Sequence, residues 1–185
     1  MSRGQNLGKI KICHVANTDF AVKFLLLNQL KMLKREGFQV FTVCSPGSLI
    51  REIEKEGIQV KAIKIKRKIS PFFDLITLIK LFLYFKKEKF DIVHTHTPKP
   101  GLLGQLAAKL AGVPIIINTI HGFYFHQNSP VLERQFYILI EKIAAICSDL
   151  IFSQNKEDIE TAIAERICPS EKIKFLGNGI DLARF

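Results

Sequence analysis

Three histidines stand where their side chains could take part in chemistry. His94 and His96 close one β-rich run, and His121 follows another, directly before Gly122. Alternation along a strand turns the side chains of His94 and His96 to the same side. A metal pair would need a third protein ligand, and no Asp, Glu or Cys stands nearby at a recognisable spacing. We therefore expect His94 and His96 to have a structural or substrate-positioning role rather than to bind a metal.

The first predicted turn between a strand and a helix carries no phosphate-binding motif. It reads HVANTDF, where a dinucleotide site would show GxGxxG and a P-loop would show GxxxxGK followed by Ser or Thr. This argues against a nicotinamide-dependent dehydrogenase and against a P-loop kinase. Asp19, in this turn, is expected to cap the following helix.

Short β-rich runs alternate with longer stretches of helical periodicity along the chain. The runs at 9–15, 38–44, 58–65, 90–94, 113–119, 150–153 and 172–176 are expected to be strands. The stretches at 20–36, 48–56, 72–87, 101–111, 131–147 and 156–166 are expected to be helices. This alternation predicts an α/β fold, a Rossmann-like doubly wound parallel sheet of about seven strands.

In open sheets of this kind, ligands bind beyond the carboxyl ends of the strands. The predicted loops at that edge are rich in His, Asn and Gly, and they lie at 17–19, 45–47, 95–99, 121–128, 153–155 and 177–181. We therefore expect the binding site to lie along this edge.

The net charge of +10 is concentrated in one region of the chain. Residues 61–90 hold nine Lys and Arg against Asp74 and Glu88. They surround the apolar, aromatic-rich helix expected at 72–87, a pattern that fits attachment to an anionic membrane surface. It fits equally a core helix with a solvated basic rim. Nucleic-acid binding is not expected, because no reading helix or known binding motif is present.

The four cysteines indicate a reducing environment. They form no CxxC pair, and Cys13, Cys44 and Cys147 lie in apolar surroundings, as core thiols do. The first nine residues, MSRGQNLGK, lack the apolar stretch of a secretory signal, and no uncharged run reaches the length of a spanning helix. We expect a cytoplasmic protein, with peripheral attachment to the inner face of the membrane as an option.

Three segments in order resemble one known family. HTHTPKPGLLGQLAAKLAG (94–112), TIHGFYFHQ (119–127) and GNGIDLARF (177–185) resemble the N-terminal domain of retaining glycosyltransferases of the GT-B fold, family 4 (group 1). The HGFYF stretch is similar to enzymes of bacterial cell-surface polysaccharide synthesis. The resemblance implies that residues 1–185 form the acceptor-side GT-B N-terminal domain. It also implies that the C-terminal donor-binding domain is absent, since NGID marks the crossing between the two domains.

The resemblance implies transfer of a sugar from a nucleotide-sugar donor to a glycan or lipid-linked acceptor, without a metal or other cofactor. His121 matches the family histidine beside the transferring sugar, where it would donate a hydrogen bond to a hydroxyl and stabilise charge; we predict it to be catalytic. Predicted substrate-binding residues are Asn17, His96, Lys99, Gly122 and Asn178. The turn at Asn17 departs from the family's glycine pair, which argues against contact with the donor phosphates there.

Two other functions remain open from the sequence. One is a non-catalytic module that binds a membrane or a polyanion. The other is a sugar-nucleotide 2-epimerase of the same GT-B fold.

Overall fold

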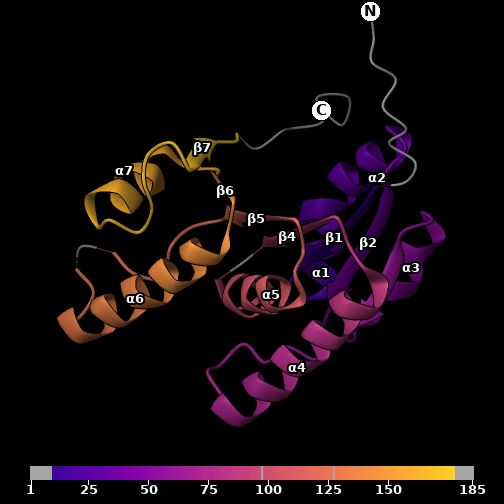
Figure 1. The fold of residues 1–185 in the computed structure, drawn as a ribbon, viewed down its shortest axis with the longest axis horizontal. Helices are drawn as coiled ribbons and strands as arrows, with labels where there is room; N and C mark the ends of the chain where they lie inside the picture. The colour runs from indigo at the N-terminus through magenta and orange to yellow at the C-terminus, as the bar shows by residue number, and fades with distance from the viewer. Residues whose placement is uncertain (1–9, 97, 127, 178–185) are drawn as a thin grey trace, which may run out of the picture.

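One parallel sheet of seven strands organises the molecule (Figure 1), here a computed structural model that describes residues 10–96, 98–126 and 128–177. Its strand order is β3-β2-β1-β4-β5-β6-β7. The strands are β1 (Lys11–Val15), β2 (Gln39–Cys44), β3 (Gln59–Ala62), β4 (Ile92–His96), β5 (Ile115–Ile120), β6 (Leu150–Ser153) and β7 (Ile173–Phe175). The order reverses between β1 and β4, as in doubly wound folds. The predicted α/β class and Rossmann-like sheet are confirmed.

Helices cover both faces of the sheet. They are α1 (Asp19–Ala21), the π-helical segment η2 (Val22–Leu26), α2 (Leu27–Arg35), α3 (Ile50–Lys55), α4 (Pro71–Glu88), α5 (Pro98–Ala111), α6 (Val131–Cys147) and α7 (Lys156–Ala164). One core cluster joins α4 and α5 to odd-numbered strand residues such as Val15 and Val93. A second joins η2, α2 and α3 to even-numbered ones such as Ile12. Strand alternation therefore decides which side chains meet which helix layer.

The ends of β4 and α5 differ from the sequence prediction. The predicted strand ended at His94 and the predicted helix began at Gly101, whereas β4 continues to His96 and α5 begins at Pro98. β4 is hydrogen-bonded on both sides, and its register with β5 pairs His96 with Thr119. Pairing to a long neighbour extends the strand beyond its β-rich residues. His96 is therefore a strand residue, and Lys99 lies in the first turn of a helix.

The first helix also differs from the prediction, because it is interrupted by η2 and is capped by another residue. Thr18 is the N-cap, and its Oγ1 accepts the N–H of Ala21 at 3.2 Å. Asp19 was predicted to be the cap, and this is wrong. Its Oδ2 instead accepts the N–H of Leu49 at 2.9 Å, next to the start of α3. The Asp19 carboxylate thus joins the loops that follow β1 and β2.

Two expectations about the chain as a whole can be compared with the structure. All four cysteines are free and buried, as expected for core thiols. Among the helices described, none combines the length and apolar character that crossing a bilayer requires.

Gly104 lets α5 pack closely on β1 and β4. A Cβ at this position would lie 2.8 Å from Cγ2 of Thr95. We expect Gly104→Ala to lower the free energy of unfolding by about 1–2 kcal/mol, since the overlap outweighs the better helix propensity of alanine. Gly101→Ala in the same helix, where a Cβ approaches no closer than 3.4 Å, is the control and should be neutral or stabilising. Urea unfolding of both variants measures the difference.

Candidate functional site

A chain of hydrogen-bonded side chains crosses the carboxyl edge of the sheet, where the strand order reverses. His14 on β1 is paired in register with His94 on β4, and both face the same layer as His96. Nδ1 of His14 lies 3.0 Å from Nε2 of His96, and Nδ1 of His96 lies 3.3 Å from Nε2 of His121. Nδ1 of His121 in turn lies 2.8 Å from Oε1 of Gln154. Two residues predicted from the sequence, His96 and His121, are thus in contact.

His14 and Gln154 were not found by the sequence analysis. A signal was available for His14, because alternation along β1 places it on one face with Ile12 and the loop residue Ala16. Only the parallel pairing of β1 with β4 brings that face beside His94 and His96. For Gln154 the signal was weaker, a polar residue in the loop after β6.

Burial keeps these imidazoles neutral. Desolvation lowers the pKa of His14 from 6.5 to about 3. It also lowers the pKa of His94 and of His96 well below the ordinary value, helped by the neighbouring histidines. The pKa of His121 is lowered by burial as well, against an opposing effect of the hydrogen bond to Gln154. Each ring therefore has one N–H and one lone pair at neutral pH.

The cluster supplies the third histidine that a metal site would need. One nitrogen each of His14, His94 and His96 lie within 4.8 Å of one another, and all three residues are buried. These nitrogens also make protein contacts, since Nε2 of His94 lies 2.7 Å from Oγ1 of Thr119. The sequence analysis looked for a third ligand among nearby Asp, Glu and Cys residues and missed this histidine. The expectation that no metal takes part in the reaction stays a prediction.

Asn17 and Lys99 meet in a separate hollow of about 270 Å³, which is also lined by Arg67 and Tyr124. Oδ1 of Asn17 is buried and has no hydrogen-bond partner among the described residues. Nζ of Lys99 is already engaged, 2.6 Å from Oδ1 of Asp74. An anion at Lys99 would have to compete with that carboxylate. The hollow lining does not include the predicted residue His121.

The two remaining predicted residues are Gly122 and Asn178. Gly122 has a φ of 112°, a conformation that favours glycine, and a Cβ there would meet nothing within 4 Å. The backbone beside His121 is therefore open to approach. Asn178 lies outside the described residues.

An apolar groove of about 440 Å³ runs between α4, α5 and α6. Its lining is mostly apolar and aromatic, with the cations Arg67, Lys68 and Lys99 and the acids Asp74 and Glu141. Burial raises the pKa of Glu141 to about 7. The groove therefore combines an apolar body with a cluster of positive charge.

Glu141 is expected to destabilise the fold at and above neutral pH. Its folded pKa lies above the ordinary value of 4.5, so its contribution is most favourable below pH 4.5 and is lost as the pH rises through 7. We expect Glu141→Gln to raise the free energy of unfolding at pH 8 by about 2 kcal/mol and to have little effect at pH 4.5. Urea unfolding at the two pH values tests this, and an equal gain at both would contradict it.

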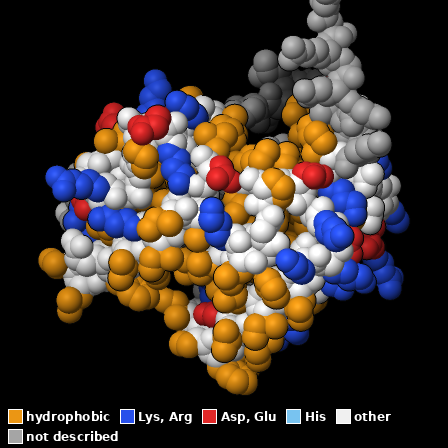
Figure 2. Space-filling model, viewed as in Figure 1, with side chains coloured by type: hydrophobic (Ala, Val, Ile, Leu, Met, Phe, Trp, Pro, Cys, Tyr) orange, Lys and Arg blue, Asp and Glu red, His pale blue; other side chains and the backbone are white. Residues whose placement is uncertain are grey.

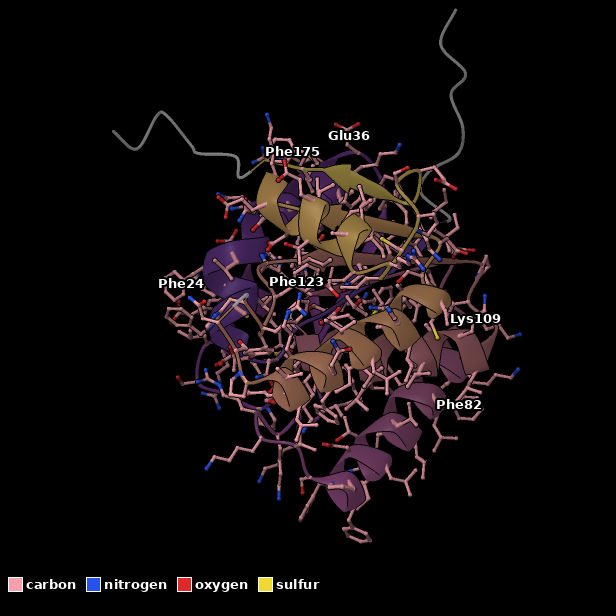
Figure 3. The ribbon with its side chains drawn as sticks, turned by 90° about the vertical axis from the view of Figure 1, so that its left-hand side faces the viewer. Phe24, Glu36, Phe82, Lys109, Phe123 and Phe175 are labelled. Carbon is pink, nitrogen blue, oxygen red and sulfur yellow. The ribbon has the colours of Figure 1, made fainter. Side chains whose placement is uncertain are left out.

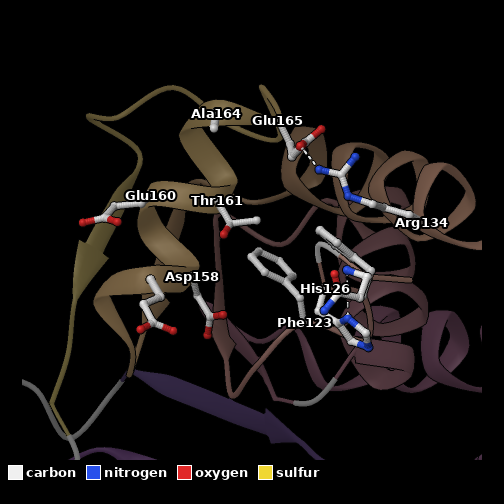
Figure 4. Close-up of a pocket in the computed structure, with 11 residues that line it drawn as sticks. Phe123, His126, Arg134, Asp158, Glu160, Thr161, Ala164 and Glu165 are labelled. Atoms are coloured by element: carbon white, nitrogen blue, oxygen red, sulfur yellow. Dashed lines mark hydrogen bonds and ion pairs between the residues drawn. The ribbon is translucent and has the colours of Figure 1, made fainter. Parts of the chain in front are cut away.

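Another hollow, of about 560 Å³, lies between α7 and the loop that follows β5 (Figure 4). Arg134 forms an ion pair with Glu165 at its edge, and Phe123 lies within it. Its lining also includes the acids Glu157, Asp158 and Glu160 beside apolar and neutral polar side chains. It contains none of the predicted site residues, although Phe123 belongs to the HGFYF segment.

Comparison with known proteins agrees with this fold. The sequence pattern described as "Glycosyl transferase 4-like" matches residues 11–155. The chain is 34% identical over 180 residues to an Escherichia coli UDP-Gal:alpha-D-GlcNAc-diphosphoundecaprenol alpha-1,3-galactosyltransferase, covering 96% of this chain and 46% of that protein. It is 32% identical to the Staphylococcus aureus capsular polysaccharide biosynthesis glycosyltransferase CapM, covering 95% and 46%. The chain thus spans about half the length of these relatives.

Solved structures show the same fold. Anabaena HepE, in complex with UDP and glucose, superposes with a TM-score of 0.72 at 16% identity, over 94% of this chain and 46% of that one. A UDP-N-acetylglucosamine 2-epimerase superposes with a TM-score of 0.67 at 21% identity, over 92% and 48%. At such identities the likeness concerns the fold alone. The family match covers the strands that carry His14, His94 and His96 and the loops that carry His121 and Gln154, and the chain belongs to the glycosyl transferase 4-like family.

Proposed function

We propose that this chain is the N-terminal, acceptor-side half of a retaining glycosyltransferase. The parent enzyme transfers a sugar from a nucleotide-sugar donor to a glycan or lipid-linked acceptor in cell-surface polysaccharide synthesis. The observation that carries the proposal is the 34% identity to a named galactosyltransferase over nearly the whole chain but less than half of that enzyme. The position of His121 and Gly122 after a central strand supports it, because ligands bind at this edge of open sheets.

In this proposal the residues divide into two groups. His121 lies at the reacting sugar with His96 behind it, while Asn17 and Lys99 contact the acceptor in the hollow that they line. Gly122 and Asn178 complete the substrate contacts. The donor is held mainly by a second domain that follows in the parent protein.

Two measurements test the proposal. The reading frame beyond Phe185 is expected to continue into a second Rossmann-like domain. The purified parent enzyme is expected to transfer sugar from a UDP-sugar to a polyprenyl-diphosphate-linked saccharide, and to do so in EDTA, as no metal is expected to take part. Epimerised UDP-sugar formed without any acceptor would instead support the 2-epimerase. A stop codon directly after Phe185, together with no transfer, would support a non-catalytic binding module.

A second proposal concerns the membrane, and it rests on apolar side chains that remain exposed. On α4 only Thr77, Leu81 and Phe85 are buried, whereas an outer stripe is exposed, formed by Phe72, Leu75, Ile79 and Leu83. α6 likewise exposes Leu132 at 86% and Ile146 at 75%. Figure 2 shows these hydrophobic side chains gathered along the lower edge of the molecule, over α4 and α6. Helix α4 is therefore not a fully buried core helix.

We propose that this surface attaches the protein, located in the cytoplasm, to the inner face of an anionic membrane. Lysines precede and follow α4, and an apolar stripe with cationic flanks suits the boundary between lipid headgroups and chains. The apolar groove with Arg67, Lys68 and Lys99 opens between the same helices. Attachment would therefore bring a lipid-linked acceptor to the domain that is proposed to bind it.

Sedimentation with vesicles tests the membrane proposal. The chain is expected to sediment with vesicles of phosphatidylglycerol and phosphatidylcholine at low salt, and less at high salt. Replacing Phe72 and Leu75 together by Ser should weaken vesicle binding about tenfold or more. Each apolar side chain buried in the membrane contributes roughly 1.5–3 kcal/mol to binding. Met32→Ser is the control, because Met32 is an exposed apolar residue on α2, outside this surface. Failure of the unmodified chain to sediment at low salt would overturn the proposal.

A further inference from the structure

Gln154 determines the direction of the hydrogen bonds between the histidines. Its Oε1 can only accept, so Nδ1 of His121, 2.8 Å away, carries a proton. A neutral imidazole has a single N–H, so Nε2 of His121 accepts and Nδ1 of His96 donates to it. By the same rule Nε2 of His96 accepts from Nδ1–H of His14. The chain ends at Nε2 of His14, a buried lone pair with no partner among the described residues.

The opposite direction is less favourable. It would require the amide nitrogen of Gln154 to donate to His121, and it would place the final proton on Nε2 of His14. That N–H would be buried with no acceptor among the described residues. A buried donor without a partner is rarer and costlier than an unused lone pair. The hydrogen bonds therefore favour three rings with the proton on Nδ1.

The same count of lone pairs argues against a metal ion in the cluster. Nδ1 of His14 carries a proton, Nε2 of His96 already accepts one, and Nε2 of His94 is bonded to Thr119. Within the described residues this leaves Nε2 of His14 and, if Nε2 of His94 donates to Thr119, Nδ1 of His94 as free lone pairs. A zinc site of this type uses three protein ligands. Metal binding would have to break the chain of hydrogen bonds.

We propose that His14, His96 and Gln154 are positioning residues that hold His121 neutral, with its proton on Nδ1 and its Nε2 lone pair available as an acceptor. In a protonated His121, the Nε2–H would face the Nδ1–H of His96, so two donors would meet. The hydrogen bonds between the histidines therefore oppose protonation of His121. This assignment rests on the proposed role of His121 at the transferring sugar. There, a neutral ring does not repel the positive charge that develops on the sugar in the transition state.

The proposal changes how His121 meets a ligand. Its Nδ1–H is already donated to Gln154, so it has no free N–H for a sugar hydroxyl. The contact between His96 and His121, at 3.3 Å, is the longest in the chain. A ligand hydroxyl that donates to Nε2 of His121 would replace this contact. His121 therefore accepts a hydrogen bond from a ligand hydroxyl rather than donating one to it.

Nitrogen NMR of the histidine rings of the 185-residue chain tests the assignment without any activity. The expected spectrum at pH 7 shows His14, His96 and His121 as neutral Nδ1–H tautomers. The resonances of each ring are assigned by their loss when that histidine is substituted. Gln154→Leu removes the acceptor of the His121 Nδ1–H and should populate the Nε2–H form of His121, with the protons of His96 and His14 also shifting to Nε2. Gln154→Glu should keep Nδ1–H. Thr119→Val is the control, because Thr119 contacts His94 outside the chain. His121 found as Nε2–H in the unmodified protein would overturn the proposal.

A second arm adds one equivalent of Zn²⁺ to the same sample. The three resonances are expected to stay unchanged. Stoichiometric changes in His14, His94 and His96 would show a metal site and would also overturn the proposal.

Kinetics of the parent enzyme test the consequence for transfer. Gln154→Leu is expected to lower kcat at least about tenfold with little change in KM, as loss of the correct tautomer does in other enzymes. Gln154→Glu should retain more of kcat and move the acidic limb of its pH profile to higher pH, because a carboxylate favours protonated His121. Identical profiles for the two variants would contradict the positioning role. If transfer is absent altogether, the proposed function fails while the spectra still decide the tautomer.

Discussion

Lowering the pH from 7 to 4 is expected to unfold this chain. The folded protein holds His14 fully buried and neutral, with a pKa of about 3 against 6.5 in the unfolded chain. Below pH 6.5 the unfolded state therefore binds more protons, and the stability falls as the pH decreases towards 3. At pH 5 His14 alone costs roughly 2 kcal/mol. His94, His96 and His121, whose pKa values burial also lowers, act in the same direction.

One group opposes this loss. Glu141, with a pKa of about 7, binds a proton between pH 7 and 4.5 in the folded state and so stabilises it. This stabilisation by Glu141 roughly offsets the loss in free energy of unfolding that one of the four histidines causes. The lowered pKa values of His94, His96 and His121 add to the loss from His14, so the net effect of acidification is destabilising.

Thermal unfolding followed by circular dichroism between pH 8 and 4 measures this effect. The midpoint temperature should fall steadily below pH 6.5. His14→Gln removes one buried titrating group and should flatten the curve. His126→Gln, which changes an exposed histidine, is the matched control and should leave its slope unchanged. A midpoint that stays constant from pH 7 to 4.5 would show that these rings are not held neutral.

His121→Ala in the parent enzyme is expected to lower kcat by about 10²–10³-fold. Loss of a group that stabilises charge at the reacting centre typically costs about 3–4 kcal/mol of transition-state energy. Truncation also leaves Nδ1 of His96 and the amide oxygen of Gln154 without their partner. The effect should fall mainly on kcat, since the predicted acceptor contacts of Asn17 and Lys99 lie in a separate hollow.

The control for this prediction is a second histidine in the same loop. His126→Ala changes an exposed ring outside the histidine chain, and kcat should remain within about twofold. Steady-state transfer assays of both variants, with unfolding curves to confirm their stability, complete the test. Equal rates for wild type and His121→Ala would remove His121 from the site.

Exposed aromatic residues near the start of η2 show a limit of periodicity arguments. The stretch 20–36 reads as one amphipathic helix, yet Phe20 and Phe24 are 60% and 61% exposed. Figure 3 shows Phe24 at the outer edge of the molecule, pointing away from the sheet. The π-helical turn Val22–Leu26 shifts the helical register, so the buried face is carried by Val22, Leu26 and Leu30. Such a shift depends on packing and leaves little trace in the sequence.

Helix α6 and strand β6, by contrast, begin and end where periodicity and β-rich composition placed them. The boundaries of α6 are clear, since Pro130 precedes the helix and Ser148 follows it. The end of β4 was missed because it depends on pairing with β5, a contact that local residue preferences do not encode.

The sequence by itself determined the parallel α/β fold and the edge of the sheet at which the site lies. It also determined that His94 and His96 share one face, because strand alternation is a local property of the backbone. Only the tertiary structure decided that His14, 80 residues before His94, joins them through the pairing of β1 with β4. Only the tertiary structure placed Gln154 beside His121, and this contact sets which ring nitrogens of the linked histidines carry a proton. These contacts join distant strands, and hydrogen-bond direction depends on every partner in the chain.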